Sequence, residues 1–161
     1  MTSPIATAKE RLSGYLRDHR IWFTVRHHPP AFAAQEVAAR EHVSGDQLAK
    51  PVVVVADGLL LMLVLPASYL VHMSRLSVAL GTTDLRLADE AELARLFPDC
   101  ELGALPPFGN LYGLDVCVDR TIAEQEHIEF RAGTHTETFG IAYADFARLV
   151  HPTIIDVARH H

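Results

Sequence analysis

The feature that most constrains the fold is the stretch LAKPVVVVADGLLLMLVLPA, which runs from Leu48 to Ala67. Four β-branched residues, Val52 to Val55, precede the pair Asp57-Gly58, and an unbroken apolar run follows from Leu59 to Leu65. An Asp-Gly pair between two such runs is a strong signal for a two-residue β-hairpin. Because the runs are apolar at consecutive positions, both faces of each strand are expected to be covered. The stretch therefore predicts a hairpin in the middle of a buried sheet.

With the two hairpin strands included, the sequence predicts fewer helices than strands. Apolar residues at helical spacing predict helices in the first 19 residues, over Ala33–Val43, Val71–Leu80, Glu90–Phe97 and Asp145–Val150. Short β-branched and aromatic runs predict further strands over Ile21–His27, Asp84–Leu87, Leu114–Asp119, His127–Ala132 and Thr138–Ala142. This order favours an α+β fold with a mixed, strongly curved, barrel-like β-sheet flanked by helices. Pro51 is expected at the first position of its strand, because proline cannot donate to a ladder.

Length and charge limit the classes of protein that need to be considered. The 161 residues suit a single domain over 1–161, and the formal net charge is −6. That charge argues against coating long nucleic-acid duplexes, although contact with one nucleic-acid end stays open. The apolar pieces are far shorter than the roughly 20 residues needed to span a membrane. The first residues lack the apolar core of a signal peptide, so we expect a cytoplasmic protein whose two cysteines are free thiols.

Lysine is scarce in this chain, which draws attention to Lys50. The sequence has two lysines, Lys9 and Lys50, and Lys50 stands directly before the most apolar run. One interpretation is a solvated charge whose stem lies on apolar surface. The other is a partly buried ammonium group that acts on an anionic ligand or a polarised carbonyl, since exclusion of water strengthens its field.

The loop GALPPFG, from Gly103 to Gly109, is the second candidate. Its glycines allow close approach to a ligand, and Pro106-Pro107 stiffen it. Free N–H groups at Ala104 and Leu105 would then be available to a carbonyl oxygen or an oxyanion. The alternative is an ordinary tight connection whose phenylalanine, Phe108, fills the core.

The ten histidines invite a metal hypothesis, but their spacing does not support one. The adjacent pairs are His27-His28 and His160-His161, and neither HxH nor HExxH occurs. Neighbouring residues of a strand point to opposite faces, so His27 and His28 are not expected to chelate one ion. His135, in the turn AGTHTE between two strands, is a candidate site residue, or else a solvated turn histidine.

These features occur in an order that resembles a known family. A His-Pro turn is followed by Lys50 before its hairpin, LPA, RLADEAE, GALPPFG, the VCVD strand and the AGTH turn. In this order, roughly from Tyr15 to Val150, the chain is similar to the YbaK/prolyl-tRNA synthetase-associated domain family of trans-editing deacylases. The most specific parts are the lysine before the hairpin and the GxxxP pattern from Gly103 to Pro107. Family members commonly have threonine after the lysine, whereas this chain has Pro51.

The resemblance implies a cofactor-free hydrolase without a metal. It would cleave the ester between a small wrong amino acid, such as alanine, serine or cysteine, and the terminal adenosine of a tRNA. The expected partners are the aminoacylated acceptor end of tRNA and an aminoacyl-tRNA synthetase, with no membrane and no DNA. Carried over from the family, the catalytic residues are Lys50, Gly103 and Pro107, and the substrate-binding residues are His28, Ala104, Leu105, Phe108, Gly109 and His135.

A second interpretation keeps the cleft but not the reaction. It is a non-catalytic relative that binds aminoacyl-adenosine, a nucleotide or a protein partner. Retention of Lys50 in a lysine-poor chain favours the enzyme, whereas Pro51 and the acidic net charge favour the binding module.

Overall fold

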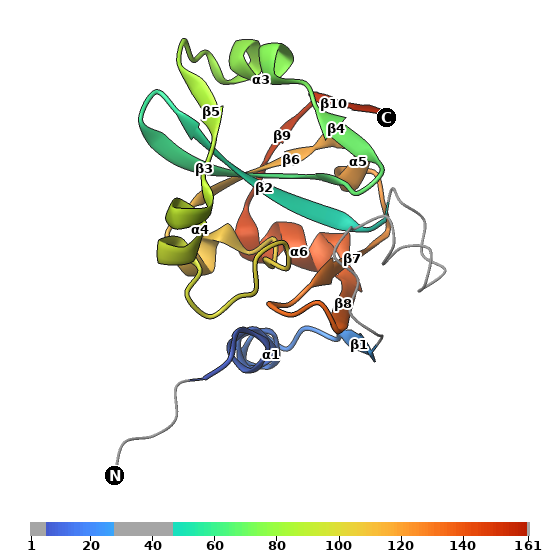
Figure 1. Ribbon diagram of the computed structural model, residues 1–161. Coiled ribbons are helices and arrows are strands. Elements are labelled where there is room, and N and C mark those ends of the chain that lie inside the picture. The colour runs from blue at the N-terminus through green and yellow to red at the C-terminus, as the bar shows by residue number, and fades with distance from the viewer. Residues whose placement is uncertain (1–5, 28–46, 161) are drawn as a thin grey trace.

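A computed structural model describes residues 6–27 and 47–160, and Figure 1 shows their arrangement. Five strands form the largest sheet, in the order β5-β2-β3-β6-β9. A three-stranded sheet has the order β1-β8-β7, and β10 pairs with β4. Helix α3 lies at one end of the molecule and α1 at the other, with the five-stranded sheet between them (Figure 1). The α+β class is thus confirmed, but no sheet in the described part of the chain closes or curls strongly, so the barrel-like expectation is not supported.

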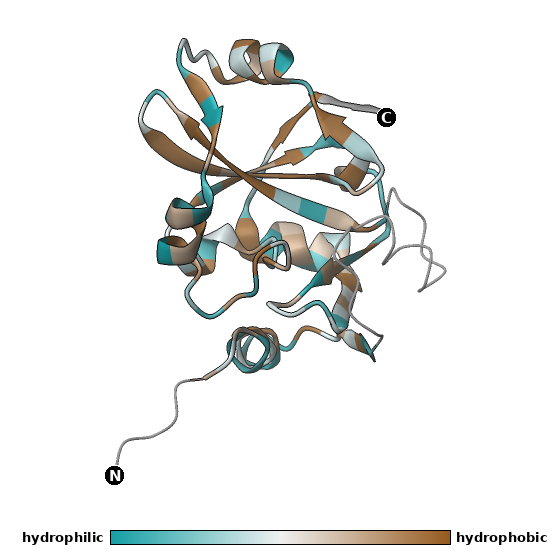
Figure 2. Ribbon diagram, in the orientation of Figure 1, coloured by the Kyte–Doolittle hydropathy of each residue, from teal (hydrophilic) through white to brown (hydrophobic). Residues whose placement is uncertain are grey.

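The predicted hairpin occupies the centre of the large sheet. Strand β2 (Ala49–Ala56) pairs antiparallel with β3 (Leu59–Pro66) along its whole length. Asp57 and Gly58 both have positive φ, +48° and +83°, as a two-residue hairpin turn requires. β3 then pairs in parallel with β6 (Asp115–Asp119), which makes the sheet mixed. These strands are hydrophobic along most of their length (Figure 2), which explains their central position.

The position of Pro51 differs from the prediction. β2 begins at Ala49, so the proline is its third residue. On the edge away from β3, strand β5 (Leu85–Leu87) pairs only with Val54–Ala56. Within the described residues that edge of β2 has no ladder beside Pro51. A missing N–H is therefore tolerated two residues inside the strand.

Helices form largely where the sequence predicts them. Helix α1 (Ala8–Asp18) is capped by the Thr7 hydroxyl, and α4 (Glu90–Leu96) begins with a complete capping box between Asp89 and Glu92. The predicted helix over Val71–Leu80 is shorter, because Tyr69–Val71 forms strand β4 and α3 spans Met73–Leu80. The predicted helix over Ala33–Val43 lies outside the described residues. The other helical elements are α5 (Arg120–Ala123), α6 (Tyr143–Val150) and the 3-10 turn η1 (Gly109–Tyr112).

The core has two parts, one on each face of the five-stranded sheet. The larger part joins α1, α6 and the three-stranded sheet, and its buried aromatic centre is made by Phe97, Phe108, Phe130, Phe139 and Phe146. The smaller part lies under α3 and contains Val54, Leu63, Leu65, Leu76, Cys117 and Val157. The remaining strands are β1 (Thr24–His27), β7 (His127–Arg131), β8 (Glu137–Ala142), β9 (Thr153–Ile155) and β10 (Ala158–His160).

Candidate functional site

Lys50 is the second residue of β2, where the central hairpin begins. Its side chain is half-buried, and its Nζ donates a hydrogen bond to the main-chain carbonyl of Tyr69 at 3.0 Å. Among the described residues, no carboxylate pairs with this ammonium group. Burial lowers the pKa of Lys50 below its ordinary value, because removal from water penalises the charged form. A neutral carbonyl does not balance the positive charge, and residues 6–27 and 47–160 supply no carboxylate that does.

Strand β7 lies next to the start of β2 and connects it with the GALPPFG loop. Leu48, two residues before Lys50, forms a parallel β-bridge with Glu129 of β7. The main-chain N–H of Glu129 donates to the main-chain carbonyl of Gln47 at 2.9 Å. Two residues farther along β7, the Arg131 guanidinium donates to the carbonyl of Gly103 at 2.6 Å. The strand that carries Lys50 and the loop that begins at Gly103 are therefore both adjacent to β7.

The loop is more firmly bonded at its start than the sequence predicts. Gly103 has φ +81°, in the left-handed region. Ala104 is fully buried, and its N–H donates to the carbonyl of Glu101 at 3.0 Å, so the prediction of a free N–H at this residue is wrong. The Leu105 N–H has no hydrogen-bond partner among the described residues. Of the two predicted donors, Leu105 is therefore the one available to a ligand.

The second half of the loop packs into the core. Pro106 and Pro107 are buried, and the ring of Phe108 is 0% exposed, edge-on to Phe130 and Phe146 with 5.4 Å between ring centroids. A Cβ added at Gly109 would approach the Val116 side chain to 2.9 Å. This matches the alternative in which Phe108 fills the core. The predicted substrate contacts of Phe108 and Gly109 stay predictions, and this packing gives them no support.

His135 lies against the loop rather than in an open turn. Its side chain is buried, with Nδ1 at 3.3 Å from Nη1 of Arg131 and Nε2 at 2.7 Å from the carbonyl of Leu102. Its main-chain N–H donates to the Glu101 carboxylate at 3.1 Å. The structure thus brings His135 to Gly103, but both ring nitrogens face groups of the chain. His28, the remaining predicted site residue, lies outside the described residues.

Arg131 and Glu101 are the residues at this site that the sequence reasoning missed. Arg131 ends a strand in which the apolar residues Ile128 and Phe130 alternate with the charged residues Glu129 and Arg131. In a strand, alternate residues share a face, so Arg131 lies on the face opposite Phe130. That alternation was the signal that could have placed Arg131 beside a polar loop.

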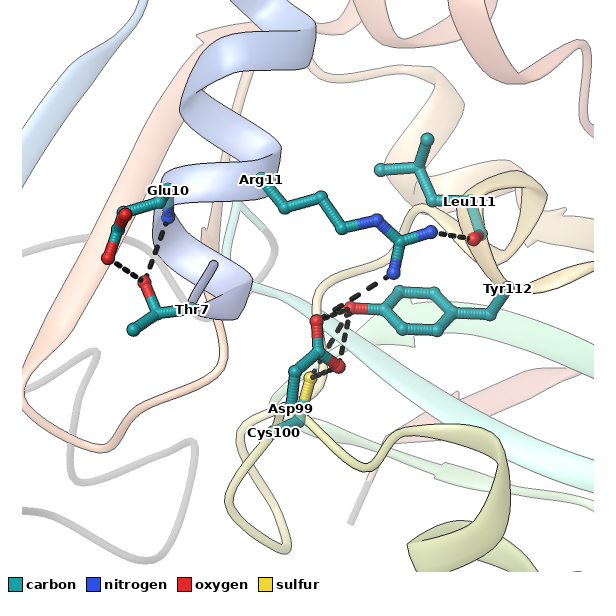
Figure 3. A network of polar contacts seen from close by, with 7 residues as sticks. All are labelled: Thr7, Glu10, Arg11, Asp99, Cys100, Leu111 and Tyr112. Atoms are coloured by element: carbon teal, nitrogen blue, oxygen red, sulfur yellow. Dashed lines mark hydrogen bonds and ion pairs between the residues drawn. The ribbon is translucent and has the colours of Figure 1, made fainter. Parts of the chain in front are cut away.

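A separate polar network holds α1 to the loops beneath it (Figure 3). The Tyr112 hydroxyl donates to Asp99 at 3.2 Å, and the thiol of Cys100 lies 3.5 Å from both the Asp99 carboxylate and the Tyr112 oxygen. Arg11 donates to the carbonyl of Leu111, and its guanidinium lies 3.7 Å from Asp99 and over the Tyr112 ring. Burial raises the pKa of the Cys100 thiol to about 12 and raises that of Tyr112. The Cys100 thiol and the Tyr112 hydroxyl therefore stay neutral at physiological pH. Cys100 and Cys117 are both free thiols, as predicted.

Next to this network, α1 and the segment 98–101 border an open cleft of about 1170 Å³. The wall opposite α1 includes Gly133 and Thr134, and the rim carries Lys9 paired with Glu137 at 2.5 Å. Across residues 6–27 and 47–160, no three or more histidine, cysteine, aspartate and glutamate side chains gather as metal ligands would. The same part of the chain contains no helix of the length and apolarity needed to cross a membrane.

Comparisons with known proteins agree with the fold and with the predicted family. The profile of a family described as "Aminoacyl-tRNA editing domain" matches residues 28–149. Among solved structures, one described as a hypothetical protein superposes with a TM-score of 0.83 at 18% identity, covering 93% of this chain and 100% of that one. A second, described as a candidate trans-editing enzyme for prolyl-tRNA synthetase, gives a TM-score of 0.81 at 19% identity over 97% of this chain and 99% of that one.

A third solved structure places the same fold inside a longer protein. It is described as a candidate signal transduction protein from Marinobacter aquaeolei VT8, with a TM-score of 0.72 at 20% identity over 91% of this chain and 30% of that one. No protein with a curated description matches the sequence significantly. At these identities the structural likenesses establish the fold alone, and the family rests on the profile match.

Proposed function

The chain belongs to the aminoacyl-tRNA editing domain family, and we propose that it hydrolyses the ester bond of a mischarged aminoacyl-tRNA with Lys50 as the essential cation. Membership supports aminoacyl-tRNA editing as the general activity. What we propose beyond this general activity is the hydrolytic reaction, the residues that carry it out and the amino acid that is removed.

The observation that carries the proposal is the state of Lys50. A half-buried ammonium group without a carboxylate partner among the described residues costs solvation energy that the Tyr69 carbonyl offsets only in part. An anionic ligand would supply the missing charge, and less water around the group strengthens that attraction. The terminal adenosine of a tRNA carries such a group in its phosphate. Lys50 would therefore hold the acceptor end while the ester enters the site.

The reaction needs no strong nucleophile from the protein, because an aminoacyl ester is already activated. A water molecule attacks the ester carbonyl, the acyl carbon–oxygen bond breaks, and the ribose hydroxyl leaves with a proton while the amino acid is released. The negative oxygen that forms in between needs a hydrogen-bond donor, for which the Leu105 N–H is available. A single donor of this kind contributes about 10²–10³ in rate. The prolines Pro106 and Pro107 would hold that donor in place, since they fix φ.

We propose a small amino acid, such as alanine, serine or cysteine, as the part that is removed. A site closed by the buried loop would reject larger side chains sterically, whereas one methylene group changes selectivity only about 10- to 200-fold. The net charge of −6 gives little general attraction to tRNA, which favours a partner synthetase that delivers the substrate. We place this activity in the cytoplasm and in a single domain that spans 1–161.

The test is a deacylation panel with tRNAs charged with alanine, serine, cysteine and threonine. We expect the wild-type protein to clear at least one of these esters, and Lys50→Ala to lower kcat/KM for it about 10²-fold or more. The matched control is Lys9→Ala, which removes the only other lysine of the chain together with its ion pair to Glu137. That control should stay within about threefold of wild type, because Lys9 lies on α1.

Two results would contradict the proposal. Equal rates for the wild-type protein and Lys50→Ala would remove Lys50 from the mechanism. No clearance of any ester, with or without an added synthetase, would instead favour the non-catalytic module that binds aminoacyl-adenosine, a nucleotide or a protein partner. Binding of a non-hydrolysable aminoacyl-adenosine, measured by calorimetry, would then identify the first of these ligands.

A further inference from the structure

Two successive main-chain carbonyls, just before and at the start of the GALPPFG loop, are held by side chains from the end of β7 and from the turn that follows it. Arg131 donates to the carbonyl of Gly103, and His135 contacts the carbonyl of Leu102. We propose that Arg131 and His135 form a clamp that sets the conformation of residues 102–105, and that Arg131 is thereby a positioning residue for the deacylation. The catalytic part of this inference rests on the proposed function, whereas the effect on the loop does not.

Arg131 is placed to act on the loop and not on solvent. It is the last residue of β7, and only 6% of it is exposed. Its Nη1 lies 2.6 Å from the Gly103 oxygen and 3.3 Å from Nδ1 of His135, so one nitrogen reaches both groups. A hydrogen bond from a charged donor is shorter and about twice as strong as a neutral one. Arg131 therefore restrains the peptide that joins Gly103 to Ala104.

The contacts of His135 define which of its nitrogens carries the proton. An arginine N–H can only donate, so Nδ1 facing Arg131 must accept. In a neutral imidazole the other nitrogen then carries the hydrogen, and Nε2 donates to the Leu102 carbonyl at 2.7 Å. Arg131 thus fixes the tautomer that allows His135 to hold the loop. The two side chains act as one unit.

Main-chain hydrogen bonds attach this loop at both ends, and within it the Ala104 N–H donates to the Glu101 carbonyl at 3.0 Å. Glu101 N–H donates to the Gly133 carbonyl at 2.8 Å, and Gly133 N–H donates to the Ala104 carbonyl at 2.8 Å. These two bonds tie residues 101 and 104 to the turn, and the clamp acts on the two carbonyls between them. The Leu105 N–H, the proposed donor to the ester, belongs to the peptide of the Ala104 carbonyl, which Gly133 holds, and the clamp restrains the two peptides directly before it.

The close fit at Gly103 adds an independent reason for the clamp. A Cβ at this residue would lie 3.3 Å from Cε1 of His135, tighter than an ordinary contact. The imidazole therefore packs directly on the glycine while it bonds the carbonyl of the residue before it. Together with φ +81°, this packing holds Gly103 in a conformation that other residues rarely adopt.

The first experiment measures the loop without any substrate. Amide hydrogen exchange over residues 101–109 is compared in the wild-type protein, Arg131→Lys and Arg131→Met. Arg131→Lys keeps the charge but loses the planar guanidinium whose Nη1 contacts both groups. We expect exchange in this segment to rise at least about fivefold in both variants, while β2 and β3 keep wild-type protection. The matched control is Arg148→Met, an exposed arginine on α6 that bonds Asp145, and it should exchange as wild type.

The second experiment links the loop to the reaction. With the ester that the wild-type protein clears, both Arg131 variants should lose about 10-fold or more in kcat with little change in KM, since a misplaced donor affects the transition state more than binding. His135→Gln can place an amide donor near the position of Nε2, so it should retain more activity and more loop protection than His135→Ala.

The outcomes separate the clamp from the proposed function. Wild-type exchange rates in both Arg131 variants would overturn the clamp whatever the enzyme does. Faster exchange with unchanged kcat would overturn the positioning role. If the wild-type protein clears no ester while Arg131→Lys loosens only residues 101–109, the deacylation proposal fails and the clamp still explains the loop.

Discussion

Lys50 and the α1 network of Arg11, Asp99, Cys100 and Tyr112 are both half-buried polar regions, but they differ in how their charges are balanced. Asp99 faces the Arg11 guanidinium and accepts from Tyr112, so each charge in the network meets an opposite charge or a dipole of the network itself. Within the described part of the chain, Lys50 has one carbonyl as its partner. The network contains its own counter-charges, whereas the described residues provide none for Lys50.

This difference indicates what each region is for. In the network, polar groups join α1, the segment around Asp99 and the η1 turn, so their loss should cost stability. At Lys50, for which the described residues provide no counter-charge, the site is receptive to an anion, so loss of the lysine should reduce ligand binding and reaction. A buried polar group that is paired within the chain stabilises the fold. A buried polar group without such a partner is a candidate functional residue.

Among the variants that test the difference between the candidate site and the α1 network, we expect the largest loss of activity from a substitution of Gly103. Gly103→Ala adds a Cβ 3.3 Å from His135 and requires a left-handed residue with a side chain. We expect deacylation to fall about tenfold or more, because the clamped loop must shift, and unfolding free energy to fall by about 1–2 kcal/mol. Steady-state deacylation and urea denaturation measure the two effects.

Gly81→Ala is the matched control for this variant. Gly81 ends α3 at φ +67°, and the space around its would-be Cβ is empty. It carries a similar backbone penalty, about 1 kcal/mol, without contact with the loop. If Gly81→Ala lowers deacylation as much as Gly103→Ala does, general destabilisation explains both variants, and the loop has no special role.

A smaller effect is expected in the α1 network. Tyr112→Phe removes the hydroxyl that donates to Asp99 and keeps the ring that packs on Phe97. The unfolding free energy should fall by about 1 kcal/mol, since that is the net worth of a typical hydrogen bond. Deacylation at 25 °C should stay within about twofold of wild type. A large loss of activity with unchanged stability would contradict this distinction, because it would show that the network contributes to the reaction.

The sequence was informative wherever the decisive interactions are local. The hairpin at Asp57-Gly58 and the helix that begins after Asp89 depend on residues within a few positions, and both were predicted. The clamp and the α1 network join residues far apart in the chain, such as Arg131 with Gly103 and Arg11 with Asp99. No periodicity encodes such pairs.

At the candidate site, too, the contacts of single residues could not be predicted from the sequence. A glycine-proline loop was expected to offer free N–H groups, yet Ala104 bonds the carbonyl of Glu101 three residues back. From the sequence alone, Phe108 could line a ligand site or fill the core. Its contacts with Phe130 and Phe146 depend on tertiary packing, which the sequence pattern does not reveal. Burial of Lys50 was suggested by its neighbours, but its bond to Tyr69 depends on the turn after β3.

The smallest effect, and the most direct test of the comparison, is the titration of Lys50 itself. Because the chain has only two lysines, a Lys9→Arg protein labelled with ¹³C-lysine gives one side-chain Cε signal to follow by NMR. Burial lowers the pKa of Lys50, so the midpoint should lie below the ordinary value of about 10.4.

The sign of the linked stability change follows from that direction. Between the lowered pKa and about 10.4, the unfolded chain holds more protons than the folded one, so the unfolding free energy should rise with pH through this window. Below the lowered pKa, Lys50 is charged in both states and the full cost of burying the charge is present. Lys50→Met should abolish this contribution. Addition of an aminoacyl-adenosine phosphate should raise the midpoint, because an anion favours the charged form. A midpoint that ligand leaves unchanged would mean that Lys50 does not meet the anion, and its uncompensated charge would then no longer distinguish it from the α1 network.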